Sequence, residues 1–89
     1  MSWYDEYITR TPGVQGGEPV VAGTRTPVRS IVVLYDIHRF DRSKVRASLP
    51  HLKLEQIDAA LDYYRDHKAE IDAIIRDQRQ ALQELSAAT

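Results

Sequence analysis

The sequence predicts a mostly α-helical fold, with a short N-terminal β-ribbon arm followed by a three- to four-helix, helix-turn-helix-like bundle. Two observations predict this division. All four glycines and three of the four prolines lie between Pro12 and Pro27. Beyond Val28 there is no glycine, only Pro50 interrupts the chain, and apolar residues recur every three or four positions, as they do on amphipathic helices. We expect a single domain with an arm at 1–28, a helix-turn-helix-like core at 28–67 and a C-terminal helix at 68–89.

The arm is predicted to contain a β-ribbon. Its strand candidates are Ile8-Thr9 and Val20-Val21, because β-branched residues favour extended backbone. Gly16-Gly17 lies between them and can adopt conformations that a Cβ resists. Thr26 followed by Pro27 predicts a helix start, with Thr26 as the N-cap and Pro27 as the first helical residue. The glycines lack the Lys-Ser/Thr pair of a phosphate-binding loop, so we interpret them as turn residues.

Two helices are predicted before Pro50. The first spans about 28–38, where apolar side chains have helical spacing. Its β-branched residues lower helix propensity and leave a strand as the alternative. The second spans about 42–48, with Asp41 or Ser43 as its cap, and it stops at Pro50.

A third helix is predicted to begin near Leu54. Its expected buried stripe consists of Leu54, Ile57, Ala60, Leu61 and Tyr64. The order of a helix, a short helix, a tight turn and a longer helix is that of a helix-turn-helix unit. We expect a break at 66–68, a fourth helix at about 69–86, and fraying over the last residues, 86–89.

Composition narrows the possible functions. The chain has no cysteine, which excludes disulfides, thiolate nucleophiles and cysteine-rich zinc sites. Its three histidines are too dispersed for a metal motif, and no catalytic constellation is apparent, so we predict no enzyme activity, no metal and no cofactor.

No apolar run approaches the roughly 18 residues of a membrane span. The N-terminus, MSWYDEY, is acidic and aromatic rather than signal-like, so a cytoplasmic location without membrane association is expected.

Two segments carry a family resemblance. They are ITRTPGVQGGEPVVAGTRTPVRSIVVLY, from Ile8, and LPHLKLEQIDAALDYY, ending at Tyr64. Together they resemble the domain of unknown function 433 family. The resemblance implies a small winged or helix-turn-helix-like body. It also implies similarity to the antitoxins of bacterial toxin–antitoxin pairs, which neutralise PIN-like ribonuclease toxins and repress their own promoters.

Positive charge gathers in one segment and suggests a nucleic-acid interface. Residues 23–50 contain only two acids, against six cations: Arg25, Arg29, Arg39, Arg42, Lys44 and Arg46. In a helix-turn-helix unit the first helix commonly contacts phosphates and the second reads the groove. Gln56, on the second helix, is the candidate base-reading residue, although Glu55 and Asp58 beside it are unfavourable near phosphates. The alternative is a solvated basic patch, since the formal net charge is only −1.

The C-terminal helix carries an apolar ridge that predicts a partner surface. Its members are Ile71, Ile74, Ile75, Leu82 and Leu85. The apolar positions Ile57, Leu61, Tyr64, Ile71, Ile75, Leu82 and Leu85 recur at intervals of four and three residues, as in a heptad seam, if Lys68 and Gln78 fill the gaps as polar members. We expect a homodimer, and the ridge's partner is a second copy, a toxin or both. The alternative function is a helical dimerisation or adaptor protein with no DNA affinity.

Overall fold

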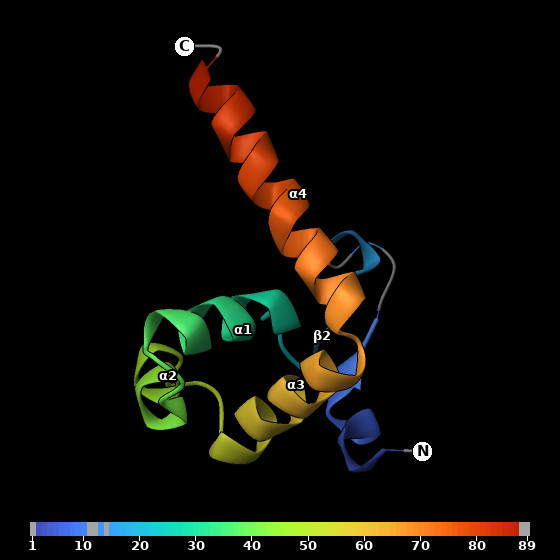
Figure 1. Cartoon of the computed structure of the whole chain (residues 1–89). Coiled ribbons are helices and arrows are strands. Elements are labelled where there is room, and N and C mark those ends of the chain that lie inside the picture. The colour runs from blue at the N-terminus through green and yellow to red at the C-terminus, as the bar shows by residue number, and fades with distance from the viewer. Residues whose placement is uncertain (1, 11–12, 14, 88–89) are drawn as a thin grey trace.

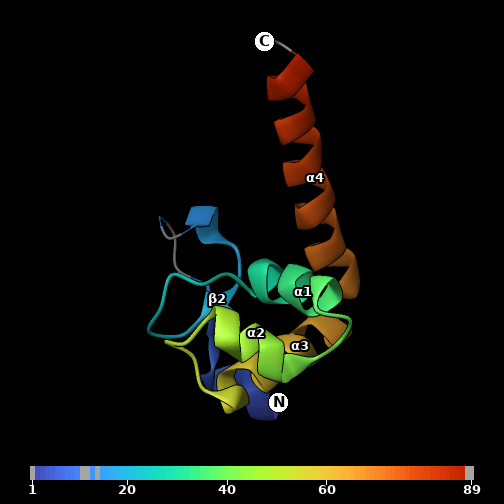
Figure 2. The same cartoon turned by 90° about the vertical axis from the view of Figure 1, so that its left-hand side faces the viewer.

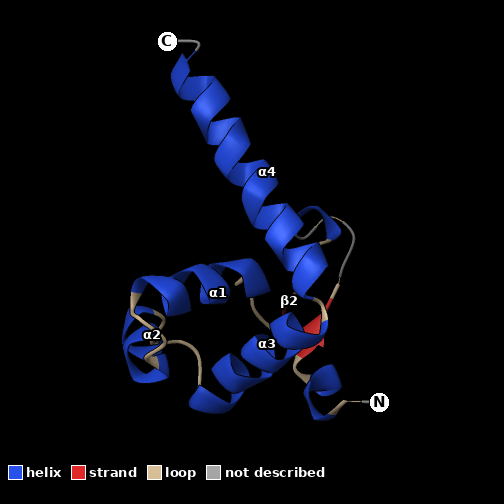
Figure 3. Ribbon diagram, in the orientation of Figure 1, coloured by secondary structure: helices blue, strands red, loops and turns tan. Residues whose placement is uncertain are grey.

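The computed structural model of the chain describes residues 2–10, 13 and 15–87. Its fold is mostly helical with one small antiparallel ribbon (Figures 1 and 3), as the sequence predicts. The elements in chain order are the 3₁₀ helix η1 (Trp3–Glu6), β1 (Ile8–Thr9), the 3₁₀ turn η2 (Gln15–Gly17), β2 (Val20–Val21), α1 (Val28–Ile37), α2 (Arg42–Ser48), α3 (Leu54–Asp66) and α4 (Lys68–Ala87).

The helices divide into a body and a projection. α3 is the centre of the body and contacts α1, α2, η1 and β1, as well as the first part of α4. α4 then continues away from the body, with its distal half standing alone (Figures 1 and 2). The molecule is consequently elongated, with extents of 43 × 29 × 23 Å.

One apolar core joins the ribbon to all four α-helices. Each element contributes a side chain with no exposed surface: Val21 from β2, Ile31 from α1, Val45 from α2, Ile57 from α3 and Ile71 from α4. Burial of one such side chain contributes about 1.5–3 kcal/mol. The core therefore holds the arm and the start of α4 onto the three-helix body.

The β-ribbon forms where the sequence predicts it, with Ile8 opposite Val21 and Thr9 opposite Val20. The predicted helix start is wrong in detail. Pro27 is the N-cap of α1, with extended backbone at φ −74° and ψ 150°, and Thr26 lies outside the helix. The Val21 N–H donates to the Thr26 carbonyl at 2.9 Å. Backbone pairing with β2 therefore includes Thr26, and the helix begins only at Val28.

The α1–α2 connection is a tight reversal. Arg39 and Phe40 both adopt positive φ, 55° and 67°, and the Phe40 N–H donates to the Tyr35 carbonyl at 2.7 Å. Asp41 then caps α2, because its Oδ1 accepts from the backbone N–H groups of Ser43 and Lys44 at 3.0 and 3.3 Å. Of the two predicted caps, Asp41 is therefore the one used.

The predicted break between the third and fourth helices is confirmed. His67 separates α3 from α4 with φ −128° and ψ 36°. On α3, Ile57 and Ala60 are buried as expected, but Tyr63 is buried in place of Tyr64. The difference arises because η1 packs on this helix and places Tyr4 edge-on to Tyr63, with ring centroids 5.6 Å apart.

Leu54 and Leu61 complete the predicted stripe of α3 and are only half-buried. Of the predicted fraying segment, residues 86 and 87 belong to α4, and residues 88 and 89 lie outside the described part of the chain.

Candidate functional site

The cationic end of the molecule is built on α2 and its flanking turns. Val45 anchors α2 in the core, which leaves the other faces of this short helix to solvent. Lys44 and Arg46 are exposed on it, and so is Arg39 in the preceding turn. Arg25 is also exposed, in the turn of the arm. Within the described residues none of these four side chains forms an ion pair; we call them the cationic set.

Arg29 and Arg42, the other two predicted DNA contacts, are engaged within the molecule. The Arg29 Nε lies 2.7 Å from the Glu18 Oε1, with both side chains largely buried. The Arg42 Nη1 donates to the Asp58 Oδ2 at 2.5 Å and joins α2 to α3. This hydrogen bond raises the pKa of Arg42 above its ordinary value. Neither guanidinium is a free phosphate contact, because each already has a carboxylate partner.

The N-terminal aromatic residues cover the polar face of α3. Trp3, Tyr4 and Tyr7 form an aromatic clamp in which each donates one hydrogen bond to an acid of that helix. The acceptors are Asp62 at 2.8 Å for the Trp3 indole N–H, Asp66 at 2.7 Å for the Tyr4 hydroxyl, and Glu55 at 3.0 Å for the Tyr7 hydroxyl. The helix that would enter a DNA groove is thus acidic and covered by the arm.

Gln56 has a structural role at the start of α3. Its Oε1 accepts a hydrogen bond from the Lys53 backbone N–H at 2.7 Å, which satisfies one of the free donors at the helix N-terminus. The amide oxygen of the predicted base-reading residue is therefore already occupied.

The turn of the arm lies against the α2–α3 turn (Figure 2). The Thr26 Oγ1 and the His51 Nε2 are 2.8 Å apart across this junction. Gly23, Thr24 and Arg25 complete the lining of an open depression at the same place. Gly23 has φ +78°, a conformation that side chains resist, and this turn carries Arg25 to the surface beside His51.

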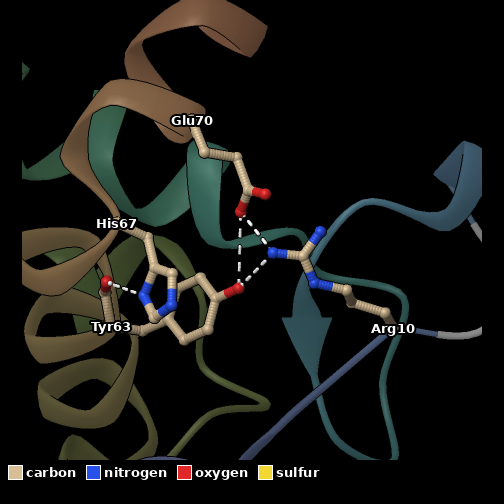
Figure 4. A network of polar contacts seen from close by, with 4 residues as sticks. All are labelled: Arg10, Tyr63, His67 and Glu70. Atoms are coloured by element: carbon tan, nitrogen blue, oxygen red, sulfur yellow. Dashed lines mark hydrogen bonds and ion pairs between the residues drawn. The ribbon is translucent and has the colours of Figure 1, made fainter.

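A partly exposed polar network joins the arm to the α3–α4 junction (Figure 4). The Arg10 guanidinium donates to the Tyr63 hydroxyl at 2.5 Å and forms an ion pair with Glu70. The His67 ring stacks on Tyr63, with centroids 4.0 Å apart and planes inclined by 12°. Burial raises the pKa of Tyr63, and Arg10 opposes that rise. Sequence patterns did not reveal this network, because its members come from the arm, α3, the junction and α4.

The predicted ridge of α4 divides into two parts. Ile71 is fully buried in the core of its own chain, so its assignment to a partner surface is wrong. Ile74 and Ile75 are half-buried against the same core. Leu82 and Leu85 are 64% and 67% exposed. Only the distal part of the ridge remains a surface, because the body packs on the first turns of α4.

The described residues include no cluster of three or more His, Asp or Glu side chains suited to a metal ion. Over the same part of the chain, none of the helices combines the length and the apolar character needed to cross a membrane.

Comparison with known proteins places the fold in a family. The profile of the family described as "Protein of unknown function (DUF433)" matches residues 8–64. The chain belongs to this family. The DUF433 member protein from Anabaena variabilis ATCC 29413, solved by crystallography at 2.00 Å resolution, is 33% identical to it, with a TM-score of 0.70. That similarity covers 81% of this chain and 70% of the other. Among curated proteins no match is found.

The family match confirms the predicted resemblance and locates it on the molecule. It spans the ribbon, α1, α2 and most of α3, and it ends at Tyr64. In this DUF433 protein α4 therefore lies outside the matched segment. The cationic set lies within it.

Proposed function

We propose that this DUF433 protein is an antitoxin-like regulator that binds DNA through the cationic set, Arg25, Arg39, Lys44 and Arg46. One observation carries the proposal. Six other cations are paired with acids: Arg10, Arg29, Arg42, Arg65, Lys68 and Arg76. The remaining two, Lys53 before α3 and Arg79 on α4, are exposed and also form no ion pair within the described residues, but they lie outside the segment that carries the set. The cationic set is exposed and has no such partners within the described residues. Uncompensated positive charge on one region attracts phosphate groups.

The proposed binding mode differs from that of a standard helix-turn-helix protein. The acids of α3 would repel phosphates, and the aromatic clamp covers part of that helix. Contacts would therefore come from α2 and from the turn of the arm. Phosphate contacts position a protein on DNA without reading its sequence. We accordingly expect affinity that varies little among duplexes of different sequence.

The toxin-related part of the proposal rests on the family resemblance. Antitoxins of this kind neutralise a PIN-like ribonuclease by binding it, so this chain would act as a binding protein in the cytoplasm, without catalysis or a cofactor. The test first identifies the gene beside its own and, where that gene encodes a PIN-like ribonuclease, co-expresses the two. Restored growth and a stoichiometric complex of the two purified proteins support the antitoxin role. A ribonuclease that remains toxic and does not bind the purified chain contradicts it.

The DNA test measures the salt dependence of binding to a fluorescent duplex from upstream of the gene. Four phosphate contacts per chain predict a slope of about −3.6 in log K against log salt. Lys44→Ala/Arg46→Ala should reduce that magnitude by about 1.8. Arg65→Ala/Arg76→Ala is the matched control, because it removes the same charge from side chains that are exposed but ion-paired. Equal effects of the two double variants on DNA affinity would show that binding depends on net charge alone, and would contradict the cationic set as the binding site.

Gln56 provides a second discriminating measurement. Because its side chain caps α3, Gln56→Ala should lower stability by about 1 kcal/mol and leave the ranking of DNA sequences unchanged. A change in that ranking at constant stability would restore Gln56 as a base reader.

A second candidate function is an adaptor without DNA affinity. The acidic, covered face of α3 favours it, since this face is where a helix-turn-helix protein would read DNA. If no duplex from the gene's neighbourhood binds at about 50 mM salt, where phosphate contacts are strong, the adaptor function replaces DNA binding.

A further inference from the structure

The distal half of α4 is a helix with no partner in its own chain. Residues 76–85 are all exposed, and short helices standing alone in water are only marginally stable. Ile75, Gln78, Leu82 and Leu85 follow one another at intervals of three, four and three residues. This is the spacing of a heptad seam, which a second helix can cover.

α4 leaves the body beside α1 (Figure 1), and the seam meets a groove between these two helices. This groove of about 460 Å³ is lined by Arg29, Ser30, Val33 and Leu34 of α1 and by Ile75, Gln78, Arg79 and Leu82 of α4. A helix lying along the distal half of α4 would reach this groove with its end. The surface therefore suits a rod-like occupant.

We propose that the occupant is α4 of a second copy, running antiparallel to the first. The charges beside the seam are self-complementary in this arrangement. Asp72 and Arg79 both occupy the flanking e position of the heptad, seven residues apart. When Ile75 of one copy lies opposite Gln78 of the other, each Asp72 faces Arg79 of the other copy. In its own chain Asp72 already accepts a hydrogen bond from the Tyr64 hydroxyl at 2.7 Å and lies 3.5 Å from the Lys68 Nζ, so Arg79 would be a further partner of a carboxylate that is still half-exposed. Two opposite-charge pairs form, related by a two-fold axis, as an isologous dimer requires.

The other flank of the seam agrees with this register. Its g positions hold Ile74 and Ala81, which face each other across the antiparallel pair and are both apolar. In an antiparallel register shifted by one heptad, Arg79 would meet its own counterpart and repel it. In a parallel pair, Arg79 would lie beside Ile74 of the other copy and gain no charge partner. Charge complementarity therefore selects one alignment.

The alignment also fills the groove. The seam position opposite Leu82 of the second copy is Ile71, which is already buried in the body. That Leu82 therefore lies on the adjacent surface of α1, over Val33 and Leu34. Each copy buries its own exposed Leu82 in the groove of the other. The inference does not depend on DNA binding, so either can fail while the other holds.

Cysteine cross-linking tests the register, because the chain has no cysteine of its own. Ile75→Cys and Gln78→Cys each carry a single thiol. The antiparallel alignment predicts that an equimolar mixture of the two forms a disulfide-linked dimer several-fold faster than either variant alone. Faster linkage within each separate variant would show a parallel pair and overturn the proposal. A chain that stays monomeric at all concentrations, and whose distal α4 is covered only when a toxin is added, would also overturn the proposal.

Charge reversal tests the same interface without touching the seam. Asp72→Arg and Arg79→Asp each replace two attractive pairs with two repulsive ones, and each should weaken the dimer roughly tenfold by sedimentation equilibrium. Asp72→Arg also removes the contacts of Asp72 with Tyr64 and Lys68 in its own chain, so Arg79→Asp is the single variant that tests the pairs between copies alone. The combined Asp72→Arg/Arg79→Asp variant should return the dissociation constant to within about threefold of the parent, since its pairs are restored. A combined variant as weak as the single ones would overturn the proposal. So would single variants with unchanged association.

Discussion

Trp3 donates its indole N–H to the Asp62 Oδ2 at 2.8 Å, although the two residues are 59 positions apart in the chain. With Tyr4 and Tyr7, this contact holds the N-terminus across α3. It decides which surface of the molecule is open, because it occupies carboxylates on the helix that a helix-turn-helix protein would place in DNA.

Tyr4→Phe tests the aromatic clamp. The Tyr4 ring is buried, and its hydroxyl donates to Asp66 at 2.7 Å. The substitution removes only that hydrogen bond, so we expect a measurable loss in the free energy of unfolding, determined by urea denaturation. Tyr7→Phe is the control and should cost less, because its bond to Glu55 is exposed and water can replace the hydroxyl.

The contrast between Ile71 and Leu82 tests the division of the ridge. Ile71→Ala leaves a cavity in the core and should cost about 2–5 kcal/mol in unfolding free energy. Leu82→Ala changes an exposed side chain, so the stability of the monomer should stay within about 0.5 kcal/mol, while self-association weakens. Thermal denaturation of dilute protein separates these effects from association. Equal losses at the two positions would show that the distal helix is already covered in the monomer.

Gly23 tests the turn that carries Arg25. An added Cβ would meet nothing within 4 Å, but φ is +78°. The expected cost of Gly23→Val is therefore backbone strain alone, about 1–2 kcal/mol. Gly23→Asn should cost less, because asparagine tolerates this region better. If both variants have the melting temperature of the parent, the turn does not require a positive φ at residue 23.

Alkaline unfolding tests the network around Tyr63. Burial raises the pKa of its hydroxyl above the ordinary value of 10.0, so the folded state holds that proton more tightly than the unfolded state. The resulting stability is fully present below about pH 10 and is lost as the pH rises through the folded-state pKa. Urea midpoints between pH 8 and pH 11 should therefore fall above pH 10.

Tyr63→Phe should lower stability at neutral pH, because Arg10 loses a hydrogen bond, and it should flatten the alkaline decline. Tyr35→Phe is the control, since the Tyr35 hydroxyl makes no hydrogen bond within the described part of the chain. A decline of the same steepness in Tyr63→Phe would assign the alkaline loss to other groups.

Local features of the sequence were enough to determine the helices, the ribbon and the family. The turns at glycine and proline, a cap at Asp41 or Ser43 and the break near His67 each depend on a few neighbouring residues, because backbone conformation and helix periodicity are short-range properties. The structure selected Asp41 of the two caps. The family match over residues 8–64 likewise depends on the sequence alone.

The tertiary structure decided which of the predicted site residues are available. Arg42 is 16 residues from Asp58, and Arg29 is paired with Glu18. Nothing in the local pattern distinguishes these arginines from Arg46. Similarly, Ile71 and Leu85 share one helical stripe, and only the packing of the body on the first turns of α4 buries the former and exposes the latter. Charge pairing and burial depend on distances between remote segments, which the fold alone determines.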